Sequence, residues 1–364
     1  MKRSVKRIIA IVVAVSILGT SCSFSEKKDS DTAVSGEQIV DCAGRTVELP
    51  QKRERIACLY AYTGHLAVLL GCEQRIVAVV DGLKRDNFMQ RKVQGLNDMS
   101  TPYNSGAINI EELAAAKPDL IFLRASNLQD EGELEKLESL GIPYIVIEYK
   151  TMEEQKKSIQ VMGQALGKQK EAEAYLTYYE ETISMVRERL SELSEEEKKT
   201  VYHSVNEVVR TDIPDTLSYQ ILEAAGCVNV VSANEELKID GEKGYTSVEE
   251  IYLWDPDIIL VNEPSAKEYF CTDTKFSGLR AVREGSVFQL PVGLSRWGHP
   301  GSLETPLAVV YIASTLYPEY FPDINIGETV KEFYNTFFHI ELTNEEIDMI
   351  LKGEGMREPK EEKK

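Results

Sequence analysis

Short apolar runs and longer helical patterns alternate along this chain. Apolar stretches with the length of a buried strand are separated by segments in which apolar residues recur at helical spacing. The runs that predict strands are 55–60, 75–80, 120–123, 200–205, 228–231 and 287–290. Strand–helix–strand units of this kind favour parallel sheets with right-handed crossovers, so the pattern predicts an α/β fold.

One block of this pattern occurs twice in the same register. The first copy, NIEEL…PDLIF, covers residues 109–122, and the second copy, SVEEI…PDIIL, covers residues 247–260. Each copy predicts a short helix that begins at a capping Asn or Ser and ends before a proline and an apolar strand. Glu112 and Glu250 occupy the capping-box position of the two helices. The repeat predicts two similar halves.

The first 36 residues have a different character. A basic start leads into an apolar run, Ile8 to Leu18, that is too short to span a bilayer and is typical of a secretion signal. The following LGTSC resembles a bacterial lipobox, which predicts that Cys22 is lipidated; the alternative is a simple cleaved signal. We therefore expect an extracytoplasmic protein, lipid-anchored to the bacterial cell membrane through a polar tether.

A second pair of matching segments, LLGC at 69–72 and AAGC at 224–227, places a glycine where a helix ends. Between the halves, residues 152–193 contain no proline and carry an apolar stripe, which predicts one long linking helix. Two parallel-sheet α/β lobes joined by this helix would leave a ligand cleft between them. The predicted parts are a signal peptide at 1–22, a disordered tether at 23–36, an N-terminal lobe at 37–150, the linking helix at 151–195, a C-terminal lobe at 196–352 and a disordered charged tail at 353–364.

Charge and missing motifs exclude several classes of function. The net charge is −19, with 60 acidic and 41 basic residues, which argues against a nucleic-acid partner. The sequence has no P-loop, no Rossmann glycine fingerprint and no H-E-x-x-H motif, and its four histidines are scattered singly. We therefore expect neither an enzyme nor a resident metal or cofactor. The cysteines other than Cys22 are odd in number, and most are expected to be small core residues: Cys42, Cys58, Cys72, Cys227 and Cys271.

Several short motifs, taken together and in order, resemble the ABC-importer binding proteins for iron complexes, haem and cobalamin. They are DCAGRTVELP at 41–50, RI at 55–56, the repeated block, GIP at 141–143 and LEAAGCVN at 222–229. The resemblance implies a helical backbone between two lobes and delivery of a small ligand to a permease dimer with its ATPase. It also implies that one glutamate on each lobe, here Glu111 and Glu249, docks into arginine pockets of the permease. The simpler alternative is that both acids only complement a helix dipole.

Loops after the predicted strands carry aromatic residues and arginines. Aromatic faces can stack on a flat ligand, and guanidinium groups can hold its carboxylates or phosphates. The candidate ligand-binding residues are Tyr60, Tyr62, Thr63, Arg85, Arg124, Asn206, Arg210, Arg296, Trp297 and His299. Trp297 with His299 is the leading pair, because a loop with Arg, Trp and His between glycines is unusual for a passive connection. The alternative for each residue is a solvated loop side chain.

The expected ligand is an iron complex (siderophore or haem) or a corrinoid, that is, a transported metal complex rather than a cofactor. A molybdate-type oxyanion, held by backbone N–H groups and arginine, is the alternative ligand. A ligand sensor of the same fold is the alternative role. An enzyme on this scaffold is opposed by the missing catalytic residues.

Overall fold

The computed structural model describes residues 36–355 apart from 105, 129–130, 234–236, 242 and 300. The described residues belong to one contact unit, which begins at Gly36. The predicted signal peptide, Cys22 and nearly all of the tether lie outside the described residues, as does the tail from 356 onward. Across the described ranges, no helix combines the length and the apolar character that a membrane crossing requires.

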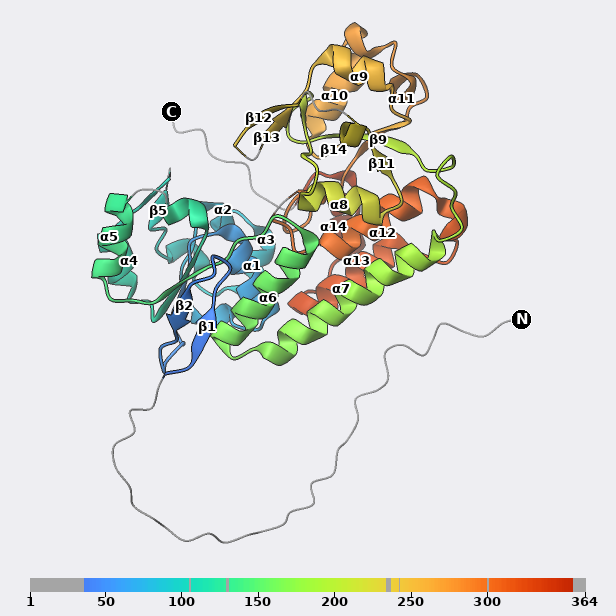
Figure 1. Ribbon diagram of the computed structural model, residues 1–364. Coiled ribbons are helices and arrows are strands. Elements are labelled where there is room, and N and C mark those ends of the chain that lie inside the picture. Colours follow the sequence, from blue (N-terminus) through green and yellow to red (C-terminus); the bar gives the residue numbers. More distant parts are fainter. Residues whose placement is uncertain are drawn as a thin grey trace, which may run out of the picture. The chain divides into compact units, whose positions relative to one another are not determined.

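The N-terminal half, coloured blue to green in Figure 1, contains a sheet of four parallel strands. Their order is β4-β3-β7-β8. Its strands are β3 (Ile56–Cys58), β4 (Ile76–Ala78), β7 (Leu120–Leu123) and β8 (Tyr144–Val146). Every residue of β3 and β7 is buried, as expected for parallel strands that are covered on both faces. The helices of this half are α1 (Ala61–Leu69), α2 (Asp81–Lys84), α3 (Asn87–Lys92), α4 (Ile110–Ala116) and α5 (Glu131–Ser139). Two antiparallel ribbons complete it, β1 (Gln38–Val40) with β2 (Thr46–Glu48) and β5 (Tyr103–Asn104) with β6 (Ala107–Ile108).

The C-terminal half repeats the same parallel order as β11-β9-β14-β15. These strands are β9 (Thr200–Ser204), β11 (Val228–Asn229), β14 (Ile258–Val261) and β15 (Val287–Gln289). Antiparallel strands extend the sheet from the carboxyl end of β9, namely β10 (Arg210–Thr211), β12 (Lys238–Asp240) and β13 (Lys243–Tyr245). The helices are α8 (Leu217–Ala224), α9 (Val248–Trp254), α10 (Pro264–Thr272) and α11 (Arg280–Arg283). The prediction of two parallel-sheet α/β halves is confirmed.

The two copies of the repeated block have the same local structure. Helices α4 and α9 each begin at a predicted capping residue, Asn109 and Ser247, whose side chain accepts the amide three positions on. Each helix ends in a left-handed residue, Lys117 with φ 50° and Asp255 with φ 37°, before the proline and the buried strand. The internal repeat read from the sequence is therefore also a structural repeat.

The capping box predicted for Glu112 is wrong. Its carboxylate accepts the Thr101 amide at 2.8 Å and the Ser100 hydroxyl at 3.0 Å, instead of turning back to the start of its own helix. The Asn109 amide is bonded to the carbonyl of Pro102 at 2.6 Å. Residues 100–102 thus make the hydrogen bonds that a capping box would have made within α4.

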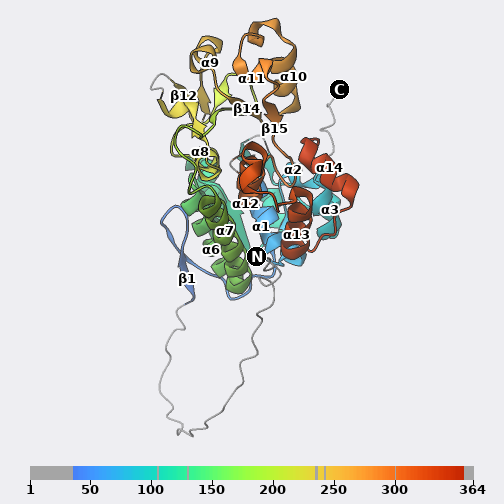
Figure 2. The ribbon, with the colours of Figure 1, turned by 90° about the vertical axis from the view of Figure 1, so that its right-hand side faces the viewer.

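The linking segment is two helices rather than the single long helix that the sequence predicted. Helix α6 (Met152–Leu166) ends at Gly167, which has φ +67°, and α7 (Gln169–Arg189) follows at once. The helices run antiparallel and side by side (Figure 2), with Gly163 of α6 against Ala172 of α7 and an ion pair between Lys156 and Glu180. Their apolar stripes therefore belong to a helical hairpin.

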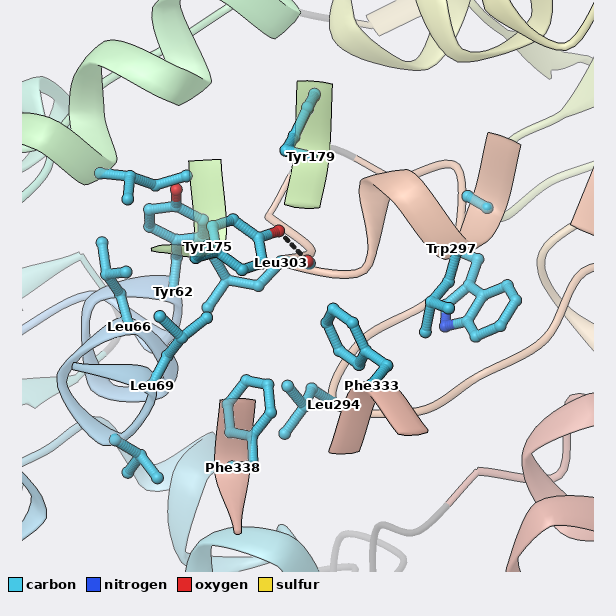
Figure 3. Close-up of a cluster of buried hydrophobic side chains, with 14 of the residues drawn as sticks. Tyr62, Leu66, Leu69, Tyr175, Tyr179, Leu294, Trp297, Leu303, Phe333 and Phe338 are labelled. Atoms are coloured by element: carbon cyan, nitrogen blue, oxygen red, sulfur yellow. Dashed lines mark hydrogen bonds between the residues drawn. The ribbon is translucent and has the colours of Figure 1, made fainter. Parts of the chain in front are cut away.

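A single hydrophobic cluster connects the two halves. It contains residues of β3 and α1 from the first half, of α6 and α7, and of α12 (Thr305–Leu316), α13 (Ile326–Phe338) and α14 (Asn344–Lys352). Tyr175 lies near its middle, where its hydroxyl donates to the carbonyl of Leu303 and its ring meets the edge of Phe333 at 6.4 Å (Figure 3). Two smaller clusters fill the rest of each sheet. Because the central cluster is shared, moving the halves apart would expose apolar surface.

Candidate ligand site

Two of the predicted residues meet at the carboxyl ends of strands in the N-terminal half. Tyr60 follows β3 and Arg124 follows β7, and the Arg124 guanidinium lies 4.9 Å from the centre of the Tyr60 ring. Glu148, after β8, accepts from Arg124 Nη2 at 3.0 Å and from the Ala125 amide at 3.3 Å. All three side chains remain partly exposed. This group, Tyr60 with Arg124 and Glu148, is called the arginine group below.

Glu148 was missed by the sequence analysis. Glu148 could have been predicted, because it closely follows the last apolar strand of the first half and so lies at the same sheet edge as Tyr60 and Arg124. Its role in the structure is to orient Arg124, because a charge-assisted hydrogen bond fixes one arm of the guanidinium. A guanidinium has five N–H donors, and Glu148 accepts from the one on Arg124 Nη2.

Tyr62 and Thr63, predicted to bind ligand, are structural residues. Both have no exposed surface. The Tyr62 hydroxyl lies 3.0 Å from Ser158 Oγ on α6, and burial raises the pKa of Tyr62 well above its ordinary value. Thr63 donates its hydroxyl to the carbonyl of Tyr60 at 2.7 Å. The first turn of α1 thus faces α6 and the core, which corrects both predictions.

Trp297, the predicted aromatic anchor, also belongs to the core. Its side chain has no exposed surface and lies in the buried cluster (Figure 3). Its ring packs edge-on against Tyr311, with the ring centres 5.8 Å apart. A large indole gains more from complete burial than from a loop position, since aromatic rings bury about 150–250 Å² each. In this placement neither ring face is open for stacking on a ligand, and the prediction is corrected accordingly.

The loop that carries Trp297, residues 291–304, is held by a buried carboxylate. Glu304 accepts from the Tyr334 hydroxyl at 2.5 Å, the Ser295 amide at 3.0 Å and the Ser302 hydroxyl at 3.1 Å. Burial raises the pKa of Glu304, while these hydrogen bonds act in the opposite direction. Gly293 passes so close that a Cβ there would lie 1.9 Å from Glu304 Oε1. The buried carboxylate therefore anchors this loop at Ser295 and Ser302.

Gly301 of the same loop lies beside Tyr60 of the arginine group. A Cβ at Gly301 would lie 3.4 Å from the Tyr60 hydroxyl, and Gly301 has φ +115°. Gln155 of α6 donates to the carbonyl of Ser302 at 2.9 Å and accepts from Thr305 at 2.9 Å. A loop from the C-terminal sheet thus lies beside a strand-end tyrosine of the N-terminal sheet. The arginine group and the backbone of Gly301 together are the candidate ligand site.

Arg296 and His299, both predicted site residues, lie on the same loop. They are partly exposed, and the His299 amide bonds to the carbonyl of Arg296 at 3.3 Å. The Arg296 guanidinium forms an ion pair with Glu263, which follows β14. Arg296, like Arg124, is therefore an arginine paired with an acid.

The remaining predicted residues lie on other loops. Arg85 ends α2 and lies 3.9 Å from Asp81, and Arg210 lies on β10 opposite Tyr245. Asn206 has φ +68°, and its amide donates to Asn262 Oδ1 at 2.7 Å. Asn206 also lines a hollow of about 520 Å³ with Glu207, Val208, Val209, Val248, Ser265, Ala266, Tyr269 and Lys275. A role of Arg85, Arg210 and Asn206 in ligand binding stays a prediction.

A larger hollow, about 680 Å³, lies between α6 and α7 and is away from this chemistry. Its lining consists of side chains of the helical hairpin, among them Lys156, Glu180 and Gln160. None of the predicted ligand residues is in that lining. Size alone therefore does not identify the site, and the candidate site is chosen for its convergent polar groups.

The cysteines and histidines form no further site within the described residues. In those ranges there is no group of three or more His, Cys, Asp or Glu side chains that could hold a metal. The five cysteines of that part are free thiols, and burial raises the pKa of Cys58 and of Cys227 to about 12. Cys58, Cys72 and Cys227 are buried core residues as expected, whereas Cys271 is exposed.

The two glutamates assigned to docking occupy equivalent exposed positions. Glu111 and Glu249 are each the second residue of their helix, α4 and α9, and both side chains are exposed. Glu112 and Glu250, one position on, are partly buried. The structure therefore leaves the first pair available to a partner, while its docking role stays a prediction.

Comparison with known proteins identifies the family. Residues 56–292 match the periplasmic binding protein family model. The molybdate-binding protein MolA of Haemophilus influenzae is 25% identical over 349 residues, which covers 89% of this chain and 95% of MolA. The MolA structure with bound molybdate superposes with a TM-score of 0.72 at 23% identity, over 84% of this chain and 99% of that chain.

Two further relatives agree. YvrC of Bacillus subtilis, an uncharacterised ABC transporter substrate-binding lipoprotein, is 22% identical over 326 residues, 86% of this chain and 97% of YvrC. A periplasmic solute-binding protein of Veillonella parvula superposes with a TM-score of 0.73 at 27% identity, over 86% of this chain and 96% of that chain. The repeated α/β halves, the helical hairpin between them and these matches place the chain in the periplasmic binding protein family, among the substrate-binding proteins of ABC transporters.

Proposed function

We propose that this chain is an extracytoplasmic solute-binding protein that captures a molybdate-type oxyanion and delivers it to an ABC permease. The observation that carries the proposal is the arginine group beside the backbone of Gly301. A small oxyanion needs guanidinium forks and backbone N–H groups rather than an aromatic platform. The likeness to MolA over nearly the full length of both chains supports the same ligand class.

A metal complex, the ligand first expected from the sequence, is the second candidate. Burial of Trp297 and Tyr62 removes two of the aromatic faces on which that expectation rested. Tyr60 remains, but Arg124 already lies over its ring. Conversely, both Arg124 and Arg296 are paired with glutamates, and these acids would oppose a highly charged anion. Because of this pairing, ferric siderophores, haem and corrinoids remain candidate ligands and are tested alongside molybdate.

A thermal-shift panel separates the two candidates. A ligand that binds only the folded chain stabilises it by about 2.7 kcal/mol at a concentration of about 100 Kd. We expect molybdate to raise the melting temperature in a concentration-dependent way, and sulfate, ferric siderophore, haem and cobalamin to have smaller effects. Arg124→Gln should reduce the molybdate shift, because it removes the charged fork but keeps a polar side chain. A shift with a metal complex and none with molybdate would reverse the order of the candidates.

Docking to the permease is assigned to Glu111 and Glu249. Removing one partner of a desolvated ion pair at an interface costs about 2–5 kcal/mol, far more than for an exposed pair. Charge reversal of both residues to lysine should abolish uptake in cells while ligand affinity in solution stays unchanged. The matched control is reversal of Glu112 and Glu250, which should cost stability, since Glu112 holds Thr101 and Ser100. Normal transport by the first double variant would contradict the assignment.

A further inference from the structure

The exposed face of α9 differs from that of its repeat partner α4 in one respect. Glu249, Tyr252 and Leu253 stand at positions i, i+3 and i+4, so they share one face of the helix. Tyr252 is 37% exposed and Leu253 is 76% exposed, the largest value among the exposed large hydrophobic residues of the described ranges. Ile251, on the opposite side, is fully buried and holds the helix to the sheet.

The equivalent face of α4 is nearly bare. The residues that follow Glu111 at the same two spacings are Ala114 and Ala115, both exposed. The two copies thus present the same acid but differ in what surrounds it. Since the buried side is similar in both copies, with Leu113 in one and Ile251 in the other, folding of the helix does not require Leu253 to be large and apolar.

Hydrogen bonds hold Tyr252, on the apolar face of α9, in place. The Tyr252 hydroxyl donates to the carbonyl of Lys275 at 2.5 Å and accepts from the Gly278 amide at 3.2 Å. Lys275 in turn lies 4.2 Å from the ring centre of Tyr269, which is 41% exposed and belongs to α10. A surface fixed in this way loses little side-chain entropy on binding. Exposed apolar residues grouped like this mark interaction sites more often than single ones do.

We infer that Tyr252 and Leu253 form an apolar docking contact for the ABC permease, present on the C-terminal copy of the docking helix and absent from the N-terminal copy. The inference rests on the proposed function, because the occupant is the permease. Glu249 lies within one helical turn on the same face, so the apolar contact continues the surface already assigned to docking. An anionic bilayer surface or a second copy of this acidic chain would bring negative charge toward Glu249, which disfavours both as occupants.

The partner surface therefore has a defined chemistry. It combines a basic pocket for Glu249 with an adjoining apolar patch that covers Leu253, whereas the surface facing Glu111 needs only the basic pocket. Contacts with the two permease subunits are consequently unequal, and the C-terminal half supplies the larger share of the affinity.

The test measures binding of the full-length chain to its cognate permease–ATPase complex in lipid nanodiscs. Leu253→Ser should weaken binding about tenfold, which corresponds to about 1.4 kcal/mol. Ala115→Ser is the matched control at the equivalent position and should stay within about twofold of the parent, the scatter of a near-neutral surface change. The loss from Leu253→Ser should persist as salt rises to about 0.5 M, whereas the loss from Glu249→Gln should shrink, because salt screens charges and not apolar contacts. The melting temperature of each variant is the control for folding.

Each outcome decides between the claims. If Glu249→Gln weakens binding and Leu253→Ser does not, the apolar contact is refuted and the docking assignment stands. Equal losses from Leu253→Ser and Ala115→Ser would refute the unequal contribution of the halves. If Glu111→Gln, Glu249→Gln and Leu253→Ser all bind as the parent does, both the docking assignment and this inference fail.

Discussion

Replacing Gly293 by alanine tests whether the loop at 291–304 is rigidly fixed. A Cβ at this position would lie 1.9 Å from Glu304 Oε1 and 2.2 Å from the Tyr334 hydroxyl oxygen. Both oxygens are buried, and the Tyr334 hydroxyl donates a hydrogen bond to Glu304 Oε1 at 2.5 Å. The Tyr334 hydroxyl also accepts the Leu294 amide at 3.0 Å, so the tyrosine cannot move aside without loosening the loop at a second point.

The expected cost can be worked out from these contacts. Losing a hydrogen bond to a charged group costs about 1.5–3 kcal/mol, and overpacking a core costs about 1–3 kcal/mol. Since the two effects overlap, Gly293→Ala should lower the free energy of unfolding by about 2–5 kcal/mol. Urea denaturation measures the change as a lower midpoint at an unchanged slope. Ligand affinity should fall as well, because the loop carries Gly301, which lies beside Tyr60 of the arginine group.

Gly82→Ala is the matched control for this experiment. Gly82 lies inside α2, its φ is not positive, and a Cβ there would meet nothing within 4 Å. Alanine is better than glycine inside a helix by up to about 1 kcal/mol, so the control should be neutral or slightly stabilising. If Gly293→Ala unfolds at the same urea concentration as the parent and binds ligand equally well, the loop is not held by Glu304 as described.

Four other substitutions test separate parts of the molecule. Glu304→Gln should remove a pH dependence, because burial raises the folded pKa of Glu304 above its ordinary value of 4.5. The stabilisation from Glu304 is full below 4.5 and is lost as pH rises through the folded pKa, so urea titrations should show this loss in the parent and not in the variant. Trp297→Ala should lower the free energy of unfolding by about 3–5 kcal/mol, as for a core aromatic, which calorimetry checks. Gly163→Val should destabilise the α6–α7 hairpin by about 1–3 kcal/mol, because a Cβ added at Gly163 would lie only 2.7 Å from the Cβ of Ala172. Circular dichroism on heating measures this change. Cys22→Ser should lose acyl label and leave the membrane fraction, and unchanged labelling would contradict lipidation.

The sheets could be predicted from the sequence because their signals are local. Four apolar residues between a proline and a polar loop are enough to predict β7 and β14. The repeated block also predicts that the two strands occupy equivalent positions in the two halves. The end of α6 was also marked locally, by Gly167 after Leu166, since a left-handed glycine commonly ends a helix. The sequence analysis predicted one helix because the segment has no proline and its apolar stripe continues past Gly167. The stripe continues because α7 packs back onto α6.

The candidate site was predictable only in part, because burial of a loop side chain depends on distant segments. Tyr60 and Tyr62 are two positions apart, yet the second is buried because Ser158 of α6 lies opposite its hydroxyl. Trp297 is buried because α12 brings Tyr311 against it. Both partners lie on other elements of the chain. Arg124 was found because it directly follows a clear strand, and Glu148 could have been found by the same rule.

The two halves share one pattern but contribute differently to the candidate site, because the loops after their last strands differ in length. After β8 the chain enters α6 within a few residues, so the first half offers side chains on short strand-end loops: Tyr60, Arg124 and Glu148. After β15 the chain makes the longer loop before α12, and a buried carboxylate is needed to fix that loop. The second half therefore offers loop backbone at Gly301 in addition to the paired Arg296. A ligand bound between them would be recognised by a guanidinium on one side and by backbone N–H groups on the other, which is the combination that a small oxyanion requires.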